Sequence, residues 1–112
     1  MTGVGPDWIR VEDVVYRENL VLTPEEVRTG WAPGGFEALT AADFAELLAG
    51  DPELALLGTG TRLRFPHPRL TADLTRAQVG IEAMDTAAAC RTFNILAAEG
   101  RRVVAALLVE ET

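Results

Sequence analysis

The sequence predicts an α/β fold in a single domain over residues 1–112, and three observations lead to this prediction. Residues 53–57 have the apolar character of a strand that is buried on both faces. Residues 81–84 show a second strand pattern, which leads directly into an apolar helix pattern over residues 85–98. A helix of about 13 residues and a strand of about six are both roughly 20 Å long, so that they can lie across one another.

The first segment of the chain predicts an amino-terminal β-hairpin. Residues 9–16 and 20–22 are rich in β-branched and aliphatic side chains, and residues 18–19 form the expected turn. Residues 25–39 follow and contain several glycines and prolines, which interrupt helices and predict a long loop.

Two aromatic residues, Trp31 and Phe36, lie in this predicted loop. They are expected either to anchor the loop on the edge of the sheet or to stay exposed as contacts for a partner. Both interpretations are physically reasonable, because aromatic side chains stabilise cores and interfaces alike.

A short helix is predicted over residues 41–49. Thr40 and Asp43 have the spacing of a capping box, in which each side chain bonds a backbone N–H of the other residue. Gly50 is suited to end the helix. The strand at residues 53–57 then follows and is expected to be a central parallel strand.

The second half of the chain continues this pattern. Residues 62–65 alternate between polar and apolar side chains and predict a short strand, and residues 70–78 are weakly helical. Residues 81–84 are expected to form an interior strand, and residues 85–98 a buried helix. Residues 103–109 form the last predicted strand.

Composition argues against several classes of function. The net charge of −7 disfavours nucleic acid and anionic membranes as partners, since both attract clustered positive charge. The sole cysteine, Cys90, and the sole histidine, His67, offer neither a disulfide nor a zinc site, and no cofactor is predicted. The longest apolar run is too short to span a bilayer. No targeting pattern is recognised at the amino terminus, so a cytoplasmic bacterial protein is the simplest interpretation.

Two strand ends are the predicted site. In open α/β sheets, ligands bind beyond the carboxyl ends of the strands, where glycines and helix N–H groups can approach an anion. The same residues can instead serve the turn and the helix cap. The candidate binding residues are Gly58, Thr59, Gly60, Glu82, Met84, Asp85 and Thr86.

Glu82 has two interpretations. On an interior strand its carboxylate needs a partner, and an arginine at position 62, 64, 101 or 102 could form that ion pair. Alternatively, Glu82 and Asp85 could act as an acid and base. Dinucleotide binding is disfavoured, because Leu63 stands where the third glycine of the motif belongs.

Four short motifs together resemble one known family. They are Gly58-Thr59-Gly60, Asp85-Thr86, Thr92-Phe93-Asn94 and Glu99-Gly100-Arg101. In this combination the chain resembles the family that includes mitochondrial respiratory complex I assembly factor 3. The resemblance implies a three-layer domain whose central sheet is mixed, with one strand opposing the rest.

Two functions compete on these grounds. The resemblance implies a non-catalytic protein-interaction or assembly-factor-like module with a protein partner. The alternative is a binder of, or an enzyme acting on, a small anionic metabolite near Gly58 and Asp85. The first is favoured, because Cys90 has no evident histidine partner and no other nucleophile with a base is recognised.

Overall fold

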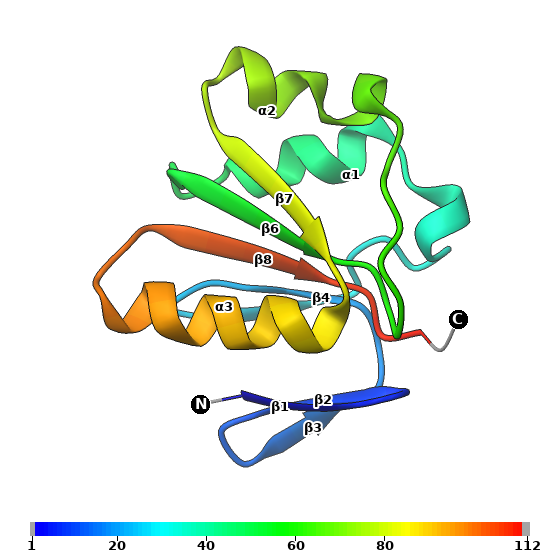
Figure 1. Ribbon diagram of the computed structural model, residues 1–112, viewed down its shortest axis with the longest axis vertical. Coiled ribbons are helices and arrows are strands. Elements are labelled where there is room, and N and C mark those ends of the chain that lie inside the picture. The colour runs from blue at the N-terminus through cyan, green and yellow to red at the C-terminus, as the bar shows by residue number, and fades with distance from the viewer. Residues whose placement is uncertain (1, 111–112) are drawn as a thin grey trace.

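Two β-sheets form over residues 2–110, which the computed structural model describes (Figure 1). The small sheet is antiparallel, with the order β1-β2-β3, and the large sheet has the order β5-β4-β8-β6-β7. Strand β4 opposes the other strands of the large sheet, as the family resemblance implied. The strands are β1 (Thr2–Gly5), β2 (Trp8–Val11), β3 (Val14–Tyr16), β4 (Leu20–Leu22), β5 (Val27–Thr29), β6 (Leu54–Gly58), β7 (Gly80–Met84) and β8 (Val103–Leu107).

Helices cover both faces of the large sheet and confirm the three-layer prediction. Helices α1 (Ala41–Ala45) and α2 (Ala72–Arg76) lie on one face, and α3 (Thr86–Ala98) lies on the other (Figure 1). Helix α3 packs against β6 and β8 on one side and against β1 on the other. The small sheet is thus an additional cover beyond α3.

The central strand β8 shows why its sequence is apolar throughout. All of its side chains are buried, because alternate residues face opposite helix layers. Val104 and Ala106 join the cluster that includes Phe44 and Leu74, on the side of α1 and α2. The residues of β8 that face α3 are Val103, Ala105 and Leu107.

Most of the predicted elements are confirmed. The helix expected at residues 41–49 is α1 followed by the 3-10 turn η2 (Glu46–Leu48). Its capping box is complete, since Asp43 N donates to Thr40 Oγ1 at 3.2 Å and Thr40 N donates to Asp43 Oδ2 at 2.9 Å. The weak helix at 70–78 is the 3-10 turn η3 (Pro68–Thr71) followed by α2.

An amino-terminal hairpin is present, but its strands differ from those predicted, which were residues 9–16 and 20–22. Strands β2 and β3 pair with each other, whereas β4 crosses to the large sheet and pairs with β5 and β8. Asn19 is therefore not a turn residue. Its Nδ2 donates to Ala32 O at 2.8 Å, and its Oδ1 accepts from Val109 N at 2.7 Å, so that it bridges two other segments.

Three further predictions are wrong. Residues 62–65 form no strand. They belong to a loop in which the side chain of Arg64 bonds the backbone of Thr59, and this explains the alternation of polar and apolar residues. Strand β7 lies at the edge of the large sheet rather than in its interior. The predicted loop over residues 25–39 contains strand β5, which pairs with β4.

Candidate functional site

The two predicted strand ends meet at one edge of the large sheet. Strands β6 and β7 are parallel neighbours, so that their carboxyl ends lie side by side. Thr59 N donates to Met84 O at 2.9 Å, and Thr86 N donates to Gly60 O at 2.9 Å. The loop after β6 and the start of α3 are therefore joined directly.

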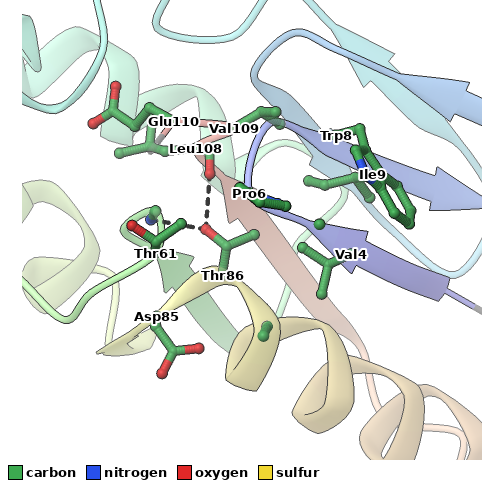
Figure 2. A pocket seen from close by; sticks show the side chains of 13 residues that line it. Val4, Pro6, Trp8, Ile9, Thr61, Asp85, Thr86, Leu108, Val109 and Glu110 are labelled. Atoms are coloured by element: carbon green, nitrogen blue, oxygen red, sulfur yellow. Dashed lines mark hydrogen bonds between the residues drawn. The ribbon is translucent and has the colours of Figure 1, made fainter. Parts of the chain in front are cut away.

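The buried hydroxyl of Thr86 ties three segments together. It donates to Leu108 O at 2.8 Å and accepts from Gly60 N at 2.8 Å (Figure 2). Both of its partners are backbone groups that would otherwise be buried without a hydrogen bond. The Asp85-Thr86 motif thus has a structural role at the junction of β6, α3 and the segment after β8.

Close packing explains both glycines of the Gly58-Thr59-Gly60 turn. A Cβ atom on Gly58 would lie 3.0 Å from the Cα and the Oγ1 of Thr86. Gly60 has a φ of 99°, and a Cβ there would lie 2.6 Å from Glu110 O. No larger residue fits either position without moving the backbone around it.

A cavity of about 290 Å³ opens beside this junction. One wall comes from the small sheet, through Val4, Pro6 and Ile9, and another comes from the first turn of α3 (Figure 2). The wall from the small sheet was not predicted, because it depends on how that sheet packs against α3. The cavity has an apolar lining on one side, which suits a hydrophobic side chain or ligand group.

The amino-terminal end of α3 has few free N–H groups with which to bind an anion. Asp85 Oδ1 accepts from Ala88 N at 2.8 Å, and Thr86 N is bonded to Gly60 O. The carboxylates of Asp85 and Glu110 belong to residues that line the same cavity. The Asp85 carboxylate and the occupied donors weaken the attraction that a helix N-terminus has for an anion, and the Glu110 carboxylate is paired with Arg64.

Glu82 is exposed on the edge strand β7, so the prediction that it is buried on an interior strand is wrong. Two of its proposed arginine partners are engaged elsewhere, since Arg64 pairs with Glu110 and Arg101 pairs with Glu53. The hydrogen bond from Arg101, at 2.8 Å, lowers the pKa of the exposed Glu53 carboxyl.

Trp31 is buried, with 3% of its surface exposed. Its Nε1 donates to Asp43 O at 3.0 Å, and its ring meets Phe44 edge to face at 6.1 Å between centroids. Trp31 is therefore a core anchor, which confirms the first of its two interpretations, and the alternative that it is an exposed interface residue is wrong. Phe36 is half-buried beneath the guanidinium of Arg64, 4.3 Å from its ring centroid.

Arg64 fixes the loop that follows β6. Its backbone N donates to Thr59 Oγ1 at 3.0 Å, and its Nη2 donates to Thr59 O at 2.7 Å and pairs with Glu110. Thr59 Oγ1 also donates to Arg62 O at 2.7 Å. The buried Thr59 and the arginine above it thus hold one conformation of this loop.

The same loop carries the most exposed large apolar side chain of the described residues. Phe65 is 74% exposed and Leu63 is 48% exposed, on either side of the inward-facing Arg64. We call these two residues the Leu63/Phe65 surface. Their alternation with Arg64 predicted a strand, and this exposed surface was not predicted. The sequence signal for this surface is the apolar pair Leu63 and Phe65 on either side of an arginine, in a segment that is bounded by glycine and proline.

The comparisons with known proteins agree with this fold. The model of a family described as protein of unknown function (DUF498/DUF598) matches residues 1–108. An uncharacterised protein of Rhodobacter capsulatus is 38% identical over 95% of this chain and 81% of its own length. A crystal structure of a Bordetella parapertussis protein is 39% identical with a TM-score of 0.88, covering 95% of this chain and 91% of that one.

A mouse relative carries a functional name. The protein called NADH dehydrogenase (ubiquinone) 1 alpha subcomplex assembly factor 3 is 33% identical over 79% of this chain. The match covers 48% of the mouse protein, so this chain spans about half the length of that relative. No helix within residues 2–110 is long and apolar enough to cross a membrane. The chain belongs to the DUF498/DUF598 family, and the predicted resemblance to complex I assembly factor 3 is confirmed.

Proposed function

We propose that this chain is a non-catalytic protein-interaction module with an assembly-factor-like role, and that it binds its partner through the Leu63/Phe65 surface. The observation that carries the proposal is the exposure of Phe65 on a loop whose conformation is already fixed by Thr59 and Arg64. Aromatic residues are enriched at protein interfaces. A loop that is ordered before binding loses little further entropy on association.

The roles of the strand-end side chains support a non-catalytic function. Thr59, Asp85 and Thr86 each use their side chains to bond backbone groups of the turn and the helix. Groups engaged in this way stabilise the fold and are poorly placed to transfer protons. The name of the mouse relative also supports a protein as partner, without identifying which protein this chain binds.

Affinity capture from cells of the source organism, with quantitative mass spectrometry, tests the role. Phe65→Ser should reduce capture of the partner about tenfold or more, since a hot spot contributes at least about 2 kcal/mol. Ile95→Ser is the matched control, because Ile95 is 60% exposed on α3. Both variants should fold normally. Equal capture by Phe65→Ser and the wild type would contradict the proposal.

A small anionic metabolite at the strand ends stays an alternative, because Gly60 and the start of α3 do lie together. Titration with phosphate, followed by NMR, tests it directly. Binding there should shift the amide signals of Gly60 and Ala87 in a saturable manner. Uniform shifts across the protein, or none, would count against this alternative.

A further inference from the structure

The segment that carries the Leu63/Phe65 surface is basic, in a chain that is otherwise acidic. Residues 61–69 contain three arginines and no acidic residue. The whole chain carries −7, so the remaining residues together carry −10. A local charge of opposite sign on an acidic protein restricts the orientations in which a charged partner can approach.

Two of these arginines are available to a partner. Arg64 is neutralised by Glu110, but Arg62 and Arg69 are exposed, and neither forms an ion pair within residues 2–110. Arg62 directly precedes Leu63 in the sequence, and Arg69 follows Phe65 by four residues at the start of η3, so cationic groups lie on both sides of the apolar pair along the chain. Guanidinium groups pair readily with carboxylates and are enriched at interfaces.

The spacing of the apolar pair allows one helix to cover both residues. Exposure alternates over residues 63–67, as in an extended chain, and the prolines at 66 and 68 favour extended backbone before them. Leu63 and Phe65 are then about 7 Å apart along the loop. Side chains one turn apart on a helix are separated by about 6 Å. Two apolar residues on a partner helix can therefore cover Leu63 and Phe65 together.

We propose that the partner element bound by the Leu63/Phe65 surface is an acidic amphipathic helix. This inference rests on the proposed function and specifies its partner. The apolar face of the helix covers Leu63 and Phe65, and carboxylates beside that face pair with Arg62 and Arg69. The net negative charge elsewhere on the chain repels such a helix, which directs it to this loop.

Two designed peptides test the chemistry. Each is a helix of about 18 residues, long enough to be stable alone, with leucines on one face. One peptide has glutamates on its polar face and the other has lysines. The overall charge of −7 by itself favours the lysine peptide. Our proposal makes the opposite prediction, that fluorescence anisotropy will show the glutamate peptide binding at least tenfold more tightly.

Variants then locate the binding. Phe65→Ser should abolish binding of the glutamate peptide, and Arg62→Gln and Arg69→Gln should each weaken it severalfold. Arg91→Gln and Ile95→Ser, both at exposed positions of α3, are the matched controls and should bind as the wild type does. Raising the salt from about 0.05 M to about 0.3 M should weaken binding, because exposed ion pairs are screened.

Several results would overturn the inference. These are equal or stronger binding of the lysine peptide, no binding of either peptide, and loss of binding in the α3 controls. Binding of single-stranded DNA or of anionic vesicles that depends on Arg62 and Arg69, without peptide binding, would assign the loop to those ligands instead. Dimerisation lost in Phe65→Ser would assign it to a second copy. If cellular capture still depends on Phe65, the interaction role stands and only the helix chemistry falls.

Discussion

At the scale of single residues, the Thr86 hydroxyl makes the most specific stability prediction. Thr86→Val keeps the shape of the side chain but leaves Gly60 N–H and Leu108 C=O buried without their partner. The free energy of unfolding in urea should fall by about 1 to 3 kcal/mol for each group left unsatisfied. Thr86→Ser keeps the hydroxyl and should recover much of this loss. A Thr86→Val protein as stable as the wild type would contradict the assigned role.

Trp31 gives a second prediction at this scale, which follows from its role as a core anchor. Trp31→Ala should reduce the free energy of unfolding by about 3 to 5 kcal/mol, because it removes a buried ring and its hydrogen bond to Asp43. Phe65→Ala is the matched control and should change stability by less than about 0.5 kcal/mol. The prediction fails if the two variants unfold at the same urea concentration.

The residues that could be predicted from the sequence are those whose role is local. Asp85 as a cap and Gly60 as a turn residue follow from neighbours in the chain. Trp31 and Phe65 could not be assigned in this way, because their exposure depends on packing between distant segments. The indole of Trp31 bonds Asp43 in α1, whereas Phe65 follows Arg64, whose side chain is bonded to Thr59.

At the scale of elements, α3 was predicted closely, and its buried face allows a test. Phe93 is 5% exposed and packs in the cluster with Ala89 beneath the sheet. Phe93→Ala should therefore cost about 3 to 5 kcal/mol in urea unfolding. Ile95→Ala, on the solvent side of the same helix, should cost far less. A loss below about 1 kcal/mol in Phe93→Ala would show that the face is assigned wrongly.

Strand pairing was harder to predict than the strands themselves. The apolar pattern of β4 identifies a buried strand. The neighbouring sequence does not determine whether this strand pairs with β3 or with β8, which lies over 80 residues away. An asparagine is common in turns, but its side chain can equally bridge two distant segments, as Asn19 does here. The edge position of β7 likewise depends on strand order, and the prediction for Glu82 failed for that reason.

At the scale of the whole molecule, we propose that both sheets unfold as one cooperative unit. Helix α3 packs between them, contacting β1 on one side and β6 and β8 on the other, so loss of the small sheet uncovers one side of α3 (Figure 1). The two tryptophans report on different layers, since Trp8 lies in the small sheet and Trp31 packs on α1 beyond the large sheet.

Single-tryptophan variants test this proposal. Trp31→Phe leaves Trp8 as the only fluorescent reporter of its kind, and Trp8→Phe leaves Trp31. Within each variant, the urea midpoint from tryptophan fluorescence should coincide with the midpoint from far-ultraviolet circular dichroism, as two-state unfolding requires. The absolute midpoints of the variants are free to differ, because Trp31→Phe removes a buried hydrogen bond. If the Trp8 signal changes at lower urea than the circular dichroism, the small sheet unfolds separately and the single-domain proposal is wrong.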